Sequence, residues 1–300
     1  MQHLTHMQID TEGRCRSAAG MVCGMTELPP LADASFLCDV VAQTMNKTAN
    51  LEYREPSITD IAEFDQRHGA DAFPDPLLTA HRLSRFYLVG AGDFVYSIGK
   101  LLGLDEPMVV SPAVLARSAA EYASRCKYIS VPEDSPELRL AKLSNLFKEG
   151  FNDMGVNKPN ADEELVKVSR AFNVWRSRQD LPKASMPNYS ALVAALSPDM
   201  GKSEYEGLSG IAHASAITLT GTFLAAQMKH EKRIEDSWRH VLFAVQCGLL
   251  ASAQVCVLRN GDKTPINHCL TLFYDAVQKY NRYLWDRSVA AGFTPPEPRP

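Results

Sequence analysis

The sequence predicts an all-α protein, folded as a single multi-helix bundle. Two observations favour this class. Helix-start signals recur along the chain, each a capping residue followed by a proline at the first helical position, where the absent N–H would have no partner anyway. No segment alternates apolar and polar residues with the period of two that is typical of a half-buried strand, so we expect no sheet.

Five of the expected helices carry a start signal. Asn160 and Glu163 have the spacing of a capping box, in which each side chain bonds the other residue's backbone N–H. The other four signals are Asp75–Pro76, Ser111–Pro112, Ser135–Pro136 and Thr264–Pro265. In chain order, the expected helices span residues 31–48, 57–67, 75–103, 111–130, 135–153, 160–178, 188–197, 203–228, 231–259 and 264–290.

The expected helix 231–259 contains an uncharged run over residues 241–258. A run of this length could cross a membrane. Gln246, Ser252 and Gln254 interrupt it, and another apolar helix follows directly, so we favour a buried central helix and expect no membrane span.

The chain divides into an N-terminal extension and one domain. Residues 1–24 show no apolar periodicity and contain several glycines, so we expect a disordered extension. Residues 25–300 should form a single α-helical domain. Helix contacts are expected to cross the proline-containing segment 179–202, which joins the two halves.

Composition limits the class of function. A formal net charge of -4 gives no general attraction to nucleic acid or to an anionic membrane, so RNA binding would need a local basic patch. The cysteines are odd in number and include no C-x-x-C pair, which favours reduced thiols in a cytoplasmic protein without a zinc site. No motif for a di-iron site, a zinc protease, a serine hydrolase or a Walker loop is present, and we expect neither metal nor cofactor.

One candidate site lies on the small-residue helix 203–228. Tyr205, Ser209 and His213 are spaced four apart and form one stripe of this helix. A histidine among alanines packs poorly unless its ring nitrogens find partners. His213 is therefore either a hydrogen-bonded core residue or a catalytic residue in a pocket.

A second polar stripe lies on helix 111–130, where Arg117, Glu121 and Arg125 also recur every four residues. Glu121 could pair with both arginines. The stripe is either a solvated face or, since its flanks are apolar or small, part of a pocket. We expect His213 to face Arg117 and Glu121 in a partly enclosed polar pocket that also contains Tyr205.

The segments "RSAAEYA" and "YEGLSGIAHAS" resemble a group of uncharacterised bacterial proteins that share an Arg-x-x-x-Glu helix and a later Tyr-x-x-Leu-Ser-x-x-x-His helix. That group is distantly similar to the HEPN superfamily of nucleotide- and RNA-handling helical domains, over residues 75–290 here. The resemblance implies a helical bundle, often a homodimer, and in active members a metal-independent RNase. Active members carry Arg-x4–6-His on a late helix, which Arg233 and His240 match, although Ile234 stands where the family has a polar residue.

Three functions follow as hypotheses. The first is binding or cleavage of an RNA or nucleotide phosphodiester, with Arg233 and His240 as the site. The second is a small-molecule enzyme or binding protein, with His213 and Glu121 as catalytic residues and with a binding set of Arg117, Arg125, Tyr205 and Ser209. The third is an interaction module without catalysis.

Overall fold

The computed structural model describes residues 8–9, 15–16, 22–23, 27–53, 57–104, 108, 110–228 and 230–292. The fold is all-α, as predicted. Its helices are α1 (Leu31–Ala49), α2 (Ser57–His68), α3 (Pro76–Leu102), α4 (Ser111–Ile129), α5 (Pro136–Asp153), α6 (Glu163–Ser177), α7 (Tyr189–Leu196), α8 (Gly201–Ala212), α9 (Ala216–Met228), α10 (His230–Leu258) and α11 (Thr264–Ala290).

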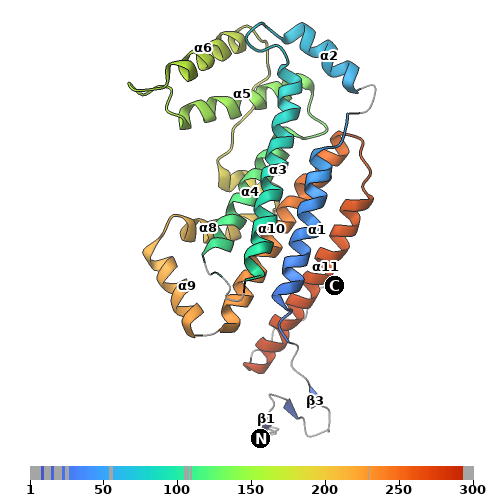
Figure 1. The fold of residues 1–300 in the computed structure, drawn as a ribbon, viewed down its shortest axis with the longest axis vertical. Helices are drawn as coiled ribbons and strands as arrows, with labels where there is room; N and C mark the ends of the chain where they lie inside the picture. Colours follow the sequence, from blue (N-terminus) through green and yellow to red (C-terminus); the bar gives the residue numbers. More distant parts are fainter. Residues whose placement is uncertain are drawn as a thin grey trace, which may run out of the picture.

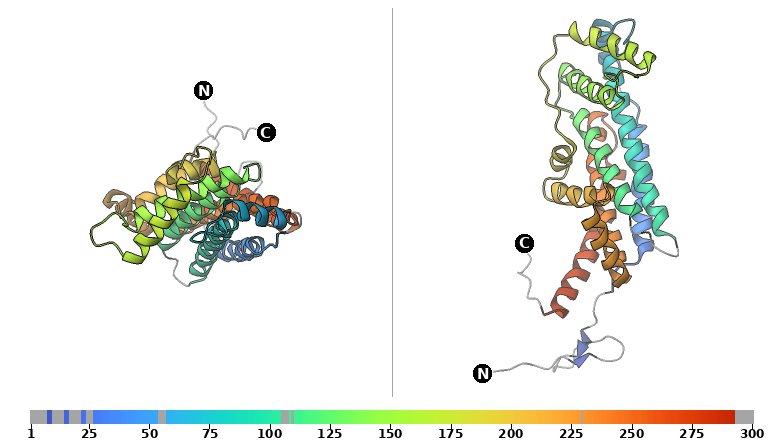
Figure 2. Two further views of the ribbon diagram at one scale, coloured as in Figure 1. Left: turned by 90° about the horizontal axis from the view of Figure 1, so that it is seen from above. Right: turned by 90° about the vertical axis from the view of Figure 1, so that its left-hand side faces the viewer.

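The long helices α1, α3, α4, α10 and α11 run along the long axis of the molecule (Figure 1). Helices α2, α5 and α6 gather at one end, and α8 and α9 lie beside the bundle toward the other end, as the second view also shows (Figure 2). This arrangement places α8 against α4 and α10, where the candidate site residues lie.

Helix α10 supplies the centre of the core, because it packs against α1, α3 and α4. Phe243 and Leu249 on α10 are buried together with Met45 on α1 and Val95 on α3. By length and composition the stretch Glu231–Leu258 could cross a membrane, yet 67% of its most apolar window is buried inside the bundle. Because α10 packs against other helices on several sides, its residues 241–258 carry no charged side chains.

The helices with predicted start signals are present, but three of the predicted caps are wrong: no side-chain cap bond is made at the starts of α3, α4 and α11, where Asp75, Ser111 and Thr264 were expected to cap. Ser135 caps α5, accepting a bond from Leu138 N at 3.2 Å. The capping box of Asn160 and Glu163 is wrong: Asp162 caps α6 and accepts from Leu165 N at 2.9 Å. An aspartate directly before the first helical residue reaches the same N–H groups without a reciprocal partner.

The predicted helix 203–228 is two helices. Helix α8 ends at Ala212, and α9 begins at Ala216. Between them Ala214 has a φ of 52°, in the left-handed region, and the chain turns. A run of small residues is compatible with a continuous helix and with a turn. The packing of α9 against its neighbours therefore decides which of the two forms.

Part of the N-terminal segment forms a small ribbon outside the bundle. Strands β1 (Gln8–Ile9), β2 (Cys15–Arg16) and β3 (Val22–Cys23) pair antiparallel. Strands of two residues are too short to produce an alternating pattern in the sequence. The other residues of segment 1–24, for which we predict disorder, lie outside the described residues.

Deleting residues 1–24 should leave stability unchanged, whereas deleting residues 1–30 should lower it. Leu28 and Leu31 pack against the core, and Trp238 Nε1 donates to Pro29 O at 2.7 Å. Losing that acceptor leaves a buried donor unsatisfied, at about 1–3 kcal/mol. We expect a chain starting at Met25 to melt within about 2 °C of the full chain, and one starting at Leu31 to melt several degrees lower. Equal losses for both chains would contradict this boundary.

Candidate functional site

Helix α8 presents one side to α4, where the two predicted polar stripes meet in part. Tyr205 Oη donates to Glu121 Oε1 at 2.7 Å, and Arg117 Nη2 donates to Tyr205 Oη at 3.3 Å. Arg117 and Glu121 also form an ion pair at 2.9 Å. The expected contact between the two helices is therefore present, through Tyr205.

Arg125 does not join this group, so the expected pairing of Glu121 with both arginines is wrong for Arg125. Its Nη2 lies 2.7 Å from Glu149 Oε2 on α5, and its guanidinium carbon lies 4.5 Å from the centre of the Tyr189 ring. Glu149 could not be predicted as a partner, because no sequence pattern brings α5 against this part of α4.

His213 is not part of this site. It is the C-cap residue of α8 and is exposed, because the helix ends there and the chain turns at Ala214. The expected enclosed pocket of His213 with Arg117 and Glu121 is therefore wrong. Ser209, one turn before it, has a buried Oγ without a hydrogen-bond partner.

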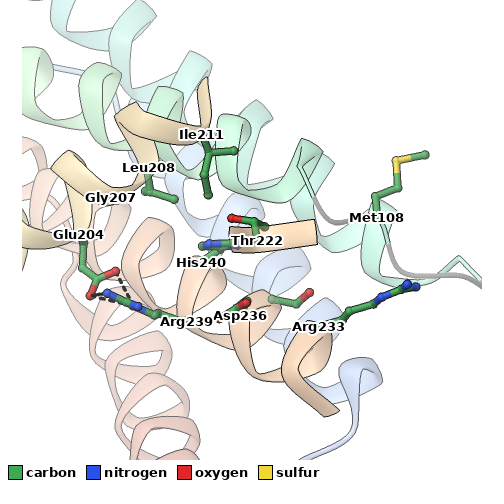
Figure 3. A pocket seen from close by; sticks show the side chains of 11 residues that line it. Met108, Glu204, Gly207, Leu208, Ile211, Thr222, Arg233, Asp236, Arg239 and His240 are labelled. Atoms are coloured by element: carbon green, nitrogen blue, oxygen red, sulfur yellow. Dashed lines mark hydrogen bonds and ion pairs between the residues drawn. The ribbon is translucent and has the colours of Figure 1, made fainter. Parts of the chain in front are cut away.

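The other side of α8 borders a pocket of about 160 Å³ between α8, α9 and α10 (Figure 3). Arg233 and His240 both line it, as does Ser237 between them on the same face of α10. In Figure 3 His240 lies beneath Leu208 and Thr222, while Arg233 extends along the rim toward Met108. The remaining lining residues are Glu204, Gly207, Ile211, Asp236 and Arg239.

His240 is a buried, uncharged base at neutral pH. Burial lowers its pKa to about 4 from the usual 6.5, and the positive charges of Arg239 and Lys232 act in the same direction. A neutral imidazole is the state that general-base chemistry requires, but a base with a pKa of about 4 takes up a proton less readily at pH 7 than one with a pKa near 7.

Two pairs of opposite charges lie around the pocket. Arg239 forms a bidentate contact with Glu204, with Nε and Nη2 at 2.7–2.9 Å from its carboxylate oxygens. Lys232 Nζ lies 2.8 Å from Asp236 Oδ1. Glu204 was missed by the sequence analysis, since nothing in the sequence relates it to a residue 35 positions later.

Within the part of the chain that the structure describes, no group of three or more His, Cys, Asp or Glu side chains is arranged to hold a metal ion. Comparison with protein-family models, curated proteins and solved structures gives no match. The geometry of the pocket is therefore the main guide to function.

Proposed function

We propose that the chain binds an RNA or nucleotide phosphodiester in the pocket of Arg233 and His240 and cleaves it without a metal ion. The observation that supports this proposal is that both residues of the Arg-x6-His pattern line one pocket. A HEPN-like homodimer in the cytoplasm, expected from the sequence, is part of the same proposal.

The size of the pocket limits what enters it. A cavity of about 160 Å³ is close to one that holds a single benzene ring, so it accepts one base, one ribose or one phosphate at a time. The rest of a nucleic acid would lie outside, near Arg233 at the rim. The pocket thus suits an unpaired nucleotide better than a stacked duplex.

The chemistry proposed is intramolecular transfer at phosphorus. Neutral His240 accepts the proton of the ribose 2′-hydroxyl while that oxygen attacks phosphorus, and the bond from phosphorus to the 5′-oxygen breaks. The imidazolium then returns the proton to the departing 5′-oxygen, leaving a 2′,3′-cyclic phosphate. Arg233 would hold the non-bridging oxygens through charge-assisted hydrogen bonds.

The small-molecule alternative has weaker support. Arg117, Glu121 and Tyr205 bond one another, and His213, the catalytic residue expected there, is exposed. The charges of Arg117 and Arg125 are already paired with carboxylates, which leaves less net charge to attract a ligand, although Arg117 Nε and Ser209 Oγ have no hydrogen-bond partner. If neither His213 nor His240 is needed for binding or cleavage, the remaining hypothesis is an interaction module without catalysis.

His240→Gln should lower cleavage of a labelled single-stranded RNA at least about 100-fold, in buffer containing a chelator, because a positioned base contributes about 10²–10⁴. Arg233→Gln should weaken RNA binding about tenfold, measured by fluorescence anisotropy, because it removes a charge-assisted bond.

Since the pKa of His240 is about 4, the cleavage rate should be flat from pH 8 to about pH 5 and fall below that.

Two matched variants separate this proposal from its rivals. His268→Gln changes an exposed histidine on α11 and should leave RNA binding and cleavage intact. His213→Gln should do the same. Dependence on His213 rather than on His240 would favour the small-molecule alternative. Absence of RNA binding by the unaltered chain would refute the proposal.

A further inference from the structure

Two arginines are buried where α3, α5 and the end of α10 meet. Arg139 on α5 is 5% exposed, and Arg259, directly after α10, is 4% exposed. His81 on α3 lies between them, 5% exposed, with its Nε2 at 3.5 Å from Arg139 Nη1. Arg259 Nη2 donates to the backbone carbonyl of His81 at 3.4 Å.

Neither guanidinium forms an ion pair with a carboxylate among the described residues. The negative charge of Asp134 acts on Arg139 without a direct contact, and Asp134 is itself paired with Lys142. Arg259 Nη1 donates to the carbonyls of Ala49 and Leu51 at 2.9 and 2.8 Å, and Arg139 Nη2 donates to that of Val131 at 2.6 Å. Carbonyls at helix ends carry partial negative charge, and they offset two full positive charges only in part.

The other polar network of the bundle is different. Arg117 is paired with Glu121, and Arg125 is paired with Glu149, so that each of these partly buried cations has a carboxylate within 3 Å. A buried charge without a counterion is costly, and proteins otherwise avoid it. Arg139 and Arg259 therefore differ from this network, because no carboxylate among the described residues is in direct contact with either of them.

Three buried N–H donors in this group also lack partners. They are Arg139 Nε, Arg259 Nε and His81 Nδ1. His81 Nε2 faces a guanidinium donor and must accept from it, which leaves the ring proton on Nδ1. Burial first, and then the charges of Arg139 and Arg259, lower the pKa of His81 to about 3, which keeps the ring neutral.

We propose that Arg139, Arg259 and His81 form a binding site for a small phosphate-like oxyanion. Backbone carbonyls already accept from part of each guanidinium, and the unpartnered N–H groups of Arg139, Arg259 and His81 remain as donors for an added acceptor. Planar guanidinium groups match the oxygen spacing of phosphate and bind it through paired hydrogen bonds.

Tyr53 separates this site from solvent. Its ring centre lies 4.6 Å from the Arg259 guanidinium carbon and 5.1 Å from the centre of the His81 ring. Tyr53 also lines an open groove of about 370 Å³ together with Ile61 and Leu78. The groove therefore borders the side chain that packs on Arg259 and His81.

This site is independent of the proposed phosphodiester pocket. Arg233 and Arg259 lie at opposite ends of α10, 26 positions apart, which corresponds to roughly 40 Å along the helix. Phosphate could bind at either place, so the test needs variants at both.

The test is thermal melting and calorimetric titration of the full chain with inorganic phosphate at pH 7, against chloride at equal ionic strength. We expect 10 mM phosphate to raise the Tm by about 3 °C through binding to the folded state. The rise should persist in Arg233→Gln and in Arg282→Gln, an exposed arginine on α11, and should disappear in Arg139→Gln.

No rise in the unaltered chain, or an equal rise in Arg139→Gln, would overturn the proposal. A rise lost only in Arg233→Gln would assign phosphate to the other pocket and also overturn it. If Arg139→Gln does not fold, Arg139→Lys serves instead. Lysine keeps the positive charge but lacks the planar guanidinium group, so this variant should bind phosphate about tenfold more weakly than the unaltered chain. Equal affinity for Arg139→Lys would then overturn the proposal.

Discussion

Lowering the pH from 7 to 4 is expected to destabilise the folded chain by about 3 kcal/mol for each of His81 and His240, the two histidines that are deeply buried among the described residues. Burial lowers the pKa of His81 to about 3 and that of His240 to about 4, from the usual 6.5. Both rings therefore stay neutral in the folded state until the pH approaches 4, while the unfolded chain takes up their protons near pH 6.5.

The direction follows from these lowered pKa values. Between about pH 6.5 and pH 4 the unfolded state binds more protons than the folded state, so stability is complete above this window and falls as the pH falls through it. Urea denaturation at half-unit steps would measure the free energy of unfolding. His81→Gln should make the slope in this window shallower, since only one of the two histidines then remains.

His268→Gln provides the matched control, because His268 is exposed on α11. It should give the same slope as the unaltered chain. A slope that His81→Gln leaves unchanged would show that His81 takes up a proton equally in both states, and the prediction would be wrong.

Gly201→Ala is expected to cost about 3 kcal/mol, because a side chain at this position meets backbone. A Cβ added to Gly201 would lie 2.4 Å from the carbonyl oxygen of Val193 and 3.0 Å from its carbon. Neither atom can move without shifting α7 against α8, and overpacking of this kind typically costs about 1–3 kcal/mol even where only side chains must move.

The matched variant is Gly207→Ala on the same helix, where an added Cβ would meet nothing within 4 Å. It should stabilise the chain by about 0.5–1 kcal/mol, because alanine is the better helix former. Melting temperatures of the two variants should therefore change in opposite directions. A loss for both would show that α8 tolerates no added methyl group, and contact with Val193 would not be the cause.

The sequence by itself determined the helical class and most of the elements. Proline at the first helical position of α3 and α5 fixes a dihedral angle locally, so it predicts a helix start wherever the rest of the chain goes. The apolar run within α10 likewise indicates a mostly buried helix, although Leu250 and Val257 in this run are exposed.

The candidate sites were predicted only in part. Arg117 and Glu121 meet on one helix face, as a four-residue spacing requires, and Tyr205 reaches them from α8. Arg233 and His240 also lie on one face of one helix and line one pocket. In each case the spacing within a helix carries the information.

Only the tertiary structure decided the rest. It ended α8 at Ala212 and paired Glu204 with Arg239. It also brought His81 on α3 and Arg139 on α5 together with Arg259, which follows α10. These residues lie 35 to 178 positions apart where they bond each other. Periodicity along a helix shows which face a residue occupies, but which other helix that face meets depends on how the whole core packs.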